Sequence, residues 1–125
     1  MYLHETMEDM EGSAHSMAGI IPGKAYHTPQ LNRFGYIYLS SGDGTVFGEP
    51  MEQIPAHEFH YFDSTACGGE FLARKPVGRR RWNCMYGREH MLAGFPHLYY
   101  YGKPQIAKAF LQECSRYAPQ SQSNV

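Results

Sequence analysis

The stretch IPAHEFHYFDS, residues 54 to 64, has the alternating pattern of a β-strand that is buried on one side. Its middle places His57, Phe59 and Tyr61 on one face and Glu58, His60 and Phe62 on the other. A strand therefore separates the two imidazoles of the His-x-x-His pair, which is poor geometry for chelating a metal. The pattern predicts a strand with hydrogen-bonded polar residues rather than a metal site.

Further strands are expected on both sides of this stretch, because β-forming residues and turn signals recur along the chain. The expected elements are a short strand at 19–23 that ends in a Pro-Gly turn, a hairpin at 33–48 that turns at 41–44, a pair of strands in EFLARKP (70–76) and RRRWNCMY (79–86), and a strand in HMLAGFPHLYYY (90–101) that breaks at Pro96.

Both ends of the chain are expected to be helical. In MYLHETMEDMEG (1–12), Leu3, Met7 and Met10 share one helical face, and a glycine can end the helix. In KPQIAKAFLQECSRYA (103–118), a proline stands in the first turn, and the apolar face consists of Ile106, Phe110 and Leu111 with Ala107 and Cys114. The chain is therefore expected to be an α/β domain over residues 1–118, followed by a polar tail at 119–125.

Composition narrows the classes of partner. The chain has 125 residues, 11 basic and 12 acidic, so its net charge of −1 gives no reason to expect nucleic acid or an anionic membrane as a partner. The three cysteines lie far apart and form no Cys-x-x-Cys motif, which is typical of reduced thiols in a cytoplasmic protein. The acidic N-terminal stretch and the lack of a long apolar run predict that the protein is not exported.

His97 is the first candidate for chemistry. It follows the strand-like run MLAGFP, and the ends of strands are where α/β folds place reactive groups. The alternative is a loop histidine that is hydrogen-bonded to backbone carbonyls.

The cysteines and the basic cluster are weaker candidates. Cys67 lies in TACGGE between two expected strands, whereas a nucleophile elbow joins a strand to a helix. Cys84 falls within a strand, and Cys114 is expected to pack on the C-terminal helix. The three arginines at 79–81 are expected to be solvated, although arginine can also bind carboxylates or phosphates. The chain has no P-loop motif.

Four segments resemble the C-terminal glutamine amidotransferase domain of cobyrinic acid a,c-diamide synthases. They are GIIPG, LNRFGYIYL, HEFHYFDS and LAGFPHLYYYGKPQIAKAFL, in this order and near the expected spacing. The resemblance extends from Met1 to about Tyr117. It implies a class I glutamine amidotransferase-like, flavodoxin-like fold with a mixed β-sheet and flanking helices, of which this chain is the second half. Nickel-sirohydrochlorin a,c-diamide synthases share these motifs, so the resemblance leaves the tetrapyrrole open.

The resemblance also implies an activity for the parent enzyme, a ligase of cobalamin biosynthesis. An N-terminal synthetase domain with a P-loop uses ATP and Mg²⁺ to activate the a and c carboxylates of a corrin precursor. The amidotransferase domain hydrolyses glutamine through a cysteine thioester and passes on the ammonia. By motif, His97 is the general base. The wider family has a glutamate two residues later, but here Tyr99 stands there, so a Cys-His dyad is implied. No cofactor or metal is expected in this chain itself.

The resemblance places five further residues near the active site or a domain interface, namely His57, Glu58, His60, Tyr61 and Tyr99. In the family, the nucleophile lies in a Cys-Gly-Gly elbow directly before a helix with a Met-Tyr-Leu-like segment, and this chain matches from that segment onward. We therefore expect the chain to be inactive alone. We also expect it to form a homo-oligomer, because lost strands leave sheet edges and apolar faces uncovered.

Two other functions remain open on the sequence. The chain can be a stand-alone, non-catalytic protein that binds a tetrapyrrole or a partner chain. It can also be a small metal-binding module that uses His57, His60 and His97.

Overall fold

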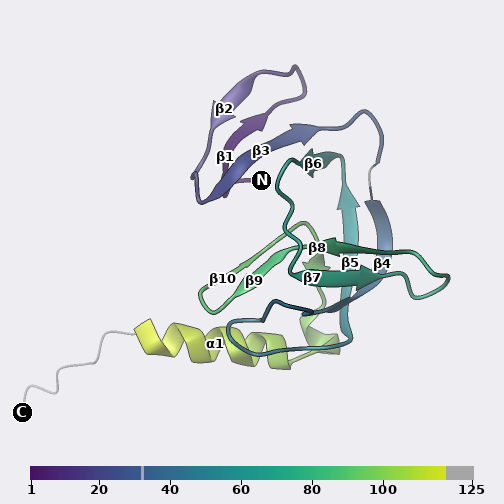
Figure 1. The fold of residues 1–125 in the computed structure, drawn as a ribbon, viewed down its shortest axis with the longest axis vertical. Coiled ribbons are helices and arrows are strands. Elements are labelled where there is room, and N and C mark those ends of the chain that lie inside the picture. Colours follow the sequence, from purple (N-terminus) through teal and green to yellow (C-terminus); the bar gives the residue numbers. More distant parts are fainter. Residues whose placement is uncertain (32, 118–125) are drawn as a thin grey trace, which may run out of the picture.

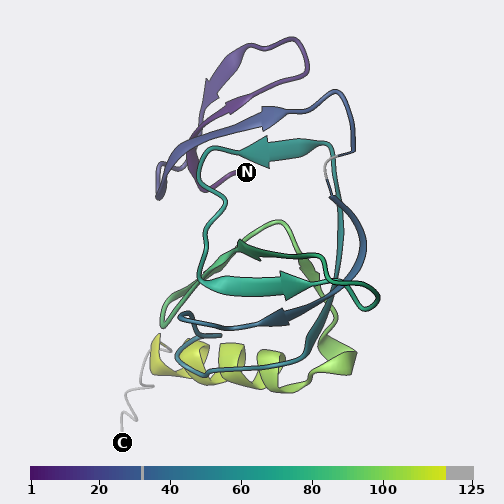
Figure 2. The same ribbon diagram turned by 45° about the vertical axis from the view of Figure 1, so that its right-hand side comes forward.

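The stretch at 54–64 forms two strands that belong to different sheets. The structure is a computed structural model that describes residues 1–31 and 33–117. Ile54–His60 forms β5, Phe62–Ser64 forms β6, and Tyr61 lies between them. β5 belongs to a five-stranded sheet of order β11-β5-β4-β7-β8, and β6 belongs to a four-stranded sheet of order β2-β1-β3-β6. The stretch therefore connects the two sheets, which Figure 1 and Figure 2 show one above the other.

The other elements complete these sheets, form a two-stranded sheet of order β10-β9, and add one α-helix among the described residues. The strands are β1 (His4–Glu8), β2 (Ala14–Ser16), β3 (Ile21–His27), β4 (Arg33–Ser40), β7 (Phe71–Arg74), β8 (Arg81–Cys84), β9 (Tyr86–Arg88), β10 (Met91–Ala93) and β11 (His97–Leu98), and the helices are the 3₁₀ turn η1 (Tyr100–Gly102) and α1 (Gln105–Tyr117). β1 and β3 are parallel, and the other strand pairs are antiparallel. An α/β fold with mixed and antiparallel sheets is thus confirmed, and the strands expected at 33–40, around 54–64 and on either side of Gly78 are present.

The core lies between one face of the five-stranded sheet and α1. Alternation along β4 and β5 turns apolar side chains to this face, where they pack with two residues of the helix. The buried set includes Ile37, Leu39, Ile54, Ala56, Phe71, Ile106 and Ala109. The opposite face of the sheet remains open.

The helix predicted at residues 1–12 is wrong, because this segment forms β1 and the turn into β2. β1 is hydrogen-bonded on both sides, to β2 and to β3. The turn is held by Asp9, whose Oδ1 accepts hydrogen bonds from the backbone N–H groups of Glu11 at 3.0 Å and Ser13 at 2.8 Å. Pairing with strands far along the chain outweighs the helical spacing of the methionines.

The hairpin predicted at 33–48 is also wrong. β4 pairs with β5 and β7. The described segment after the turn does not pair with β4: it has an isolated bridge between Val46 and Glu49, and the Thr45 N–H donates to the Gly87 oxygen at 2.8 Å. Phe47 has a positive φ of 51°, which a strand does not allow. The segment instead covers the core, and Val46 is fully buried.

Two smaller predictions need correction. The strand expected to end at the Pro-Gly turn continues as β3, and Gly23, with φ of 105°, lies inside it beside a register shift. On α1, Ile106 is buried as predicted, but Phe110 and Leu111 are 50% and 65% exposed. Ala109 and Glu113 are buried in their place. The tail predicted from residue 119 lies outside the described residues.

Candidate functional site

His97 lies at the edge of the five-stranded sheet, as the first residue of β11. Its side chain is exposed, and it has no side-chain hydrogen bond to any described residue. β11 pairs with β5, which places His97 directly opposite His57. Opposite residues of an antiparallel pair project from the same face, so both imidazoles lie on the open face.

Two grooves meet at His97. One, of about 480 Å³, is also lined by Tyr36, His57 and Tyr99. The other, of about 450 Å³, is also lined by His60, Tyr61 and Phe95 together with Phe59, Pro96 and Met1. Of the residues predicted to surround the site, His57, His60, Tyr61 and Tyr99 thus share a groove with His97, whereas Glu58 lines neither.

The open face next to His97 carries aromatic side chains. Phe34, Tyr36 and Phe59 are 59%, 75% and 49% exposed. Phe34 lies opposite Phe59, and Tyr36 lies opposite His57, with ring centroids 5.8 Å and 5.3 Å apart. Within the five described strands of this sheet, the one acidic residue, Glu58, projects from the other face. Exposed apolar surface of this kind marks binding or interaction sites.

Glu58 is fully buried on the core side of β5. Its Oε1 lies 3.7 Å from His60 Nε2 and 3.8 Å from Arg33 Nη1, so it faces two groups that can carry positive charge. Among the described residues, neither oxygen of the carboxylate accepts a hydrogen bond, and His60 Nε2 and Trp82 Nε1 are likewise buried without a partner. Burying a polar or charged group without hydrogen bonds costs free energy. The two Glu58 oxygens, His60 Nε2 and Trp82 Nε1 are the buried side-chain atoms that lack a hydrogen bond within the described residues.

Sequence reasoning missed Arg33, Trp82 and Phe95 as members of this site. Arg33 lies opposite His60 in the register of β4 and β5, and its guanidinium carbon is 5.4 Å from the centroid of the Trp82 ring. Phe95 stacks on His60. The register of β4 against β5 was the signal for Arg33, whereas nothing in the sequence pairs Phe95 or Trp82 with β5.

None of the three cysteines shares a groove with His97. Cys67 lines a cavity of about 230 Å³ that borders the 450 Å³ groove at Met1, Gly94 and Phe95 but is not lined by His97. Cys114 lines a hollow beside α1 with Phe47 and Phe110. Cys84 is buried, and burial together with the nearby charge of Glu58 raises the pKa of its thiol to about 12. Such a thiol is almost entirely protonated near neutral pH and is a poor nucleophile. The packing predicted for Cys114 is wrong, because this side chain is exposed.

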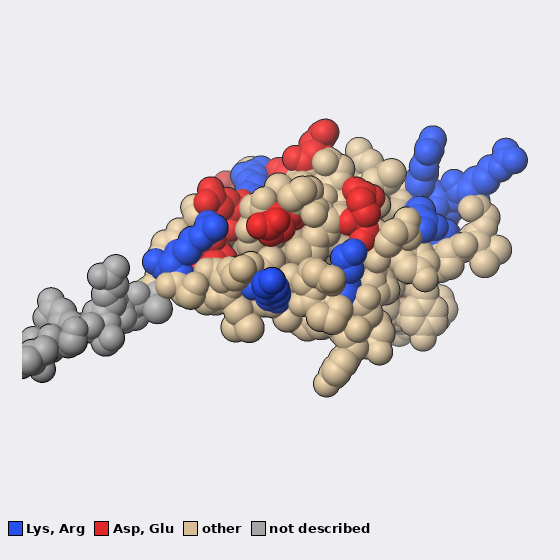
Figure 3. Space-filling view, turned by 90° about the horizontal axis from the view of Figure 1, so that it is seen from below, with Lys and Arg blue, Asp and Glu red and all other residues tan. Residues whose placement is uncertain are grey.

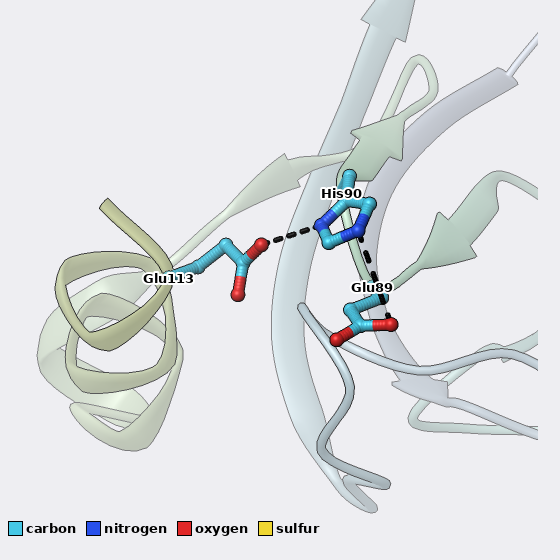
Figure 4. Close-up of side chains that lie close together, drawn as sticks. All are labelled: Glu89, His90 and Glu113. Carbon is cyan, nitrogen blue, oxygen red and sulfur yellow. Dashed lines mark hydrogen bonds and ion pairs between the residues drawn. The ribbon is translucent and has the colours of Figure 1, made fainter. Parts of the chain in front are cut away.

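A second polar cluster joins α1 to the turn between β9 and β10. Figure 4 shows Glu89, His90 and Glu113 close together, and His90 Nδ1 lies 2.5 Å from Glu113 Oε1. These three residues could supply metal ligands. However, Arg116 Nη1 lies 3.1 Å from Glu89 and 2.8 Å from Glu113, so a guanidinium already neutralises both carboxylates. We interpret the cluster as an ion-pair network that fixes the helix to the turn.

The charged surface has no single sign. Figure 3 shows acidic and basic side chains mixed on the side that carries α1, and a basic group projecting where Figure 1 places the turn between β7 and β8. Arg79, Arg80 and Arg81 in this region are exposed, as predicted for solvated arginines. Among the described helices, none combines the length and the apolar character needed to cross a bilayer.

Comparison with known proteins finds relatives that match most of this chain. No protein-family model matches the chain. Cobyrinate a,c-diamide synthases match most of it: the enzyme of Caldanaerobacter subterraneus subsp. tengcongensis is 30% identical over 119 residues, or 94% of this chain and 26% of the relative. The enzyme of Salmonella typhimurium is 32% identical over 93% of this chain and 26% of the relative, and that of Fusobacterium nucleatum is 33% identical over 82% and 22%.

The chain spans about a quarter of the length of these curated relatives. The α/β architecture described above is confirmed. The glutamine amidotransferase-like fold is more specific than this architecture, and it stays a prediction. The match nevertheless runs through both motifs that border the grooves, HEFHY and FPHLYY, since it covers nearly the whole chain. The predicted relationship is therefore confirmed: this chain is related to one segment of the cobyrinate a,c-diamide synthases.

Proposed function

We propose that this chain is the histidine-bearing part of a glutamine-dependent amidating ligase, in which His97 is the general base of the glutaminase half-reaction. The observation that carries the proposal is the position of His97, exposed at a strand end where two grooves meet. A general base has to reach its proton directly or through one water. An imidazole that has no hydrogen bond within the described residues is free to do so.

The chemistry requires a thiol that this chain does not offer beside His97. In the proposed reaction, a thiolate attacks the side-chain carboxamide of glutamine, and the protonated His97 gives its proton to the departing ammonia. Neutral His97 then takes a proton from water, which hydrolyses the thioester to glutamate and regenerates the thiol. Because neither groove of His97 is lined by a cysteine, the proposal needs a nucleophile from polypeptide outside these 125 residues.

The proposed acceptor of the ammonia is a corrinoid carboxylate. The relatives are named for cobyrinate, and we extend to this chain the conversion of the a and c carboxylates to amides. A nickel-sirohydrochlorin substrate is the alternative, because the same motifs serve both tetrapyrroles.

A chimaera tests the proposal. The segment of the Salmonella typhimurium enzyme that matches this chain is replaced by residues 1–117, and amidation of cobyrinate is measured with glutamine or with free ammonia. His97→Ala should lower the glutamine-dependent rate by a factor of about 10² to 10⁴, the usual contribution of a general base. The ammonia-dependent rate should remain, because ammonia bypasses the glutaminase step.

His15→Ala is the matched control. This imidazole is also exposed, but it pairs with Asp9 in the β1–β2 hairpin at 2.8 Å and borders neither groove. Both rates should survive this change. Loss of both rates in His97→Ala, or a glutamine-dependent rate that survives it, would contradict the role of His97.

A second candidate is a non-catalytic binding protein, which the open aromatic face of β4 and β5 favours. Rings on a sheet face can stack on a planar tetrapyrrole. Titration of the isolated chain with a corrinoid or sirohydrochlorin, followed by absorbance, distinguishes the two functions. Saturable binding that is lost in Tyr36→Ser would support the binding protein.

A further inference from the structure

The buried Glu58–His60 pair contains a proton whose position follows from the hydrogen bonds around it. His60 Nδ1 lies 2.6 Å from the backbone oxygen of Phe62. A carbonyl oxygen only accepts, so Nδ1 carries a hydrogen. In neutral His60, the lone pair of Nε2 would then face the Glu58 carboxylate, which is repulsive. The arrangement is attractive only when a second proton lies between Nε2 and the carboxylate.

The surroundings put that proton on the histidine. Burial is the largest influence on His60 and lowers its pKa, but attraction to Glu58 and the bond to the Phe62 carbonyl outweigh it, so the pKa of His60 is raised. The guanidinium of Arg33 lies on the same carboxylate, with Nη1 3.8 Å from Glu58 Oε1. In the state that the raised pKa of His60 favours, the pair is an imidazolium beside a carboxylate.

This pair touches the segment that carries His97. The His60 ring stacks on Phe95 with centroids 4.5 Å apart and an angle of 17° between planes. Phe95 stands two residues before His97, and Pro96 between them is buried. His60, Phe95 and His97 line the same groove of about 450 Å³. Since no side-chain hydrogen bond to a described residue holds His97, its location depends on this backbone segment and on the short pairing of β11.

We propose that Glu58, acting through His60, is a positioning residue for His97. The charged pair holds the His60 ring in place, the ring supports Phe95, and Phe95 fixes the backbone that presents His97 to the grooves. The inference deepens the proposed function, on which it rests for the role of His97. When His60 loses its proton, its lone pair faces the carboxylate, the pair separates, and the Phe95–His97 segment shifts.

The other groups around the pair do not change charge in the same range. Arg33 from β4 stays charged. Cys84 from β8 keeps its proton up to about pH 12, because burial and the charge of Glu58 raise its pKa, and Cys67 acts electrostatically on Cys84. His60 is thus the member of the pair whose charge changes as the pH rises above the ordinary histidine pKa. Because its pKa is raised, the pair is intact below the ordinary histidine value and is lost as the pH rises through the raised one.

NMR titration of the isolated chain tests this inference without any enzymatic activity. The ring Cε1–H signals of the seven histidines are followed against pH and assigned with single His→Gln variants. The His97 signal should show its own titration and a second inflection at the pH where His60 titrates. In Glu58→Gln, the pKa of His60 should fall, and the second inflection of His97 should move with it or vanish.

Glu113→Gln is the matched control, because Glu113 is also a buried glutamate beside an imidazole, that of His90. It should leave the titrations of His60 and His97 unchanged. An unchanged His60 titration in Glu58→Gln would overturn the inference, as would a His97 signal with one inflection in the unsubstituted chain. The latter measurement decides the matter even if Glu58→Gln does not fold.

The chimaera provides a second readout. Its glutamine-dependent kcat should fall as the pH rises through the raised pKa of His60, and Glu58→Gln should move this fall to lower pH without changing the ammonia-dependent rate. A chimaera in which His97→Ala has no effect contradicts the proposed function but leaves the NMR result standing. An absent second inflection contradicts the positioning role but leaves the base assignment standing.

Discussion

His97 and His57 lie directly opposite each other on β11 and β5, and their side chains share the open face of the five-stranded sheet. His60, three residues after His57 in β5, lies on the core side near Glu58. The three histidines of the hypothetical metal module therefore do not converge on one point. The same geometry leaves His57 and His97 free to border a groove that a polar substrate can enter.

Cys67→Ser in the chimaera should leave glutamine-dependent amidation nearly intact. Cys67 lines the cavity near His4 and Tyr86, which borders one groove of His97 at Phe95 but is not lined by His97. The thiol and the proposed base therefore line no common cavity. The measurement is the glutamine-dependent rate, with His97→Ala as the inactive reference. A drop as large as that of His97→Ala would instead make Cys67 the nucleophile.

Cys84 should resist thiol reagents in the folded protein. With its pKa raised to about 12 and its side chain buried, it should react with a disulfide reagent only after unfolding, while Cys67 and Cys114 react in the native state. Two fast thiols and one slow thiol per chain are expected. Three fast thiols would contradict the burial of Cys84.

The same thiol gives the folded state a pH dependence. In the unfolded chain, Cys84 loses its proton near its ordinary pKa of 9.0, whereas the folded chain retains it to about 12. Between these two values the folded state binds more protons, so the free energy of unfolding should decrease by about 1.4 kcal/mol for each pH unit from 9.0 to about 12. Urea unfolding measures this slope, and Cys84→Ala should lack this contribution.

Gly87→Ala should destabilise the fold. A Cβ at this position of β9 would lie 2.1 Å from Phe71 Cε2 and 2.4 Å from the backbone oxygen of Thr45, so the core has to move. We expect a loss of about 1–3 kcal/mol or more in the free energy of unfolding, the usual range for overpacking. Gly69→Ala is the control, because its Cβ would meet nothing closer than Asn83 Cβ at 4.0 Å. Equal losses in both variants would contradict the close packing at Gly87.

The open aromatic face should cause self-association of the isolated chain. We expect gel filtration to give at least twice the 14.3 kDa of one chain. Tyr36→Ser together with Phe34→Ser should shift the protein toward the monomer, whereas Leu111→Ser should not, although Leu111 is 65% exposed on α1. A monomer mass for the unsubstituted chain would count against this expectation.

Local patterns predicted the elements that depend on their own residues. The period of two in residues 33–40 and 54–64, and the helical period after Pro104, survive in β4, β5 and α1. These patterns failed where pairing with a strand far along the chain determines the structure of a segment. β1 is a strand because β3 pairs with it, and the segment around Val46 leaves β4 because β5 and β7 take both of its edges.

The sequence predicted the histidines of the candidate site, but it did not predict how Glu58 and His60 are buried. The motif names Glu58 and His60, yet their separation from solvent and the support from Phe95 depend on how the two sheets and the segment before β11 pack together. A sequence period reveals which face a side chain occupies. It does not reveal which ring stacks on it from 35 positions further along the chain.

β11 has two residues, pairs on one side only, and forms the edge of its sheet. Edge segments with few partners open locally at a small fraction of the free energy needed for global unfolding. The backbone amide of His97 should therefore exchange with deuterium much faster than those of Ile37 and Leu39 in the central strand β4. The proposed base thus lies on one of the first segments of the fold to open locally. A ligand in the grooves would therefore also determine how long His97 stays paired with His57 of β5.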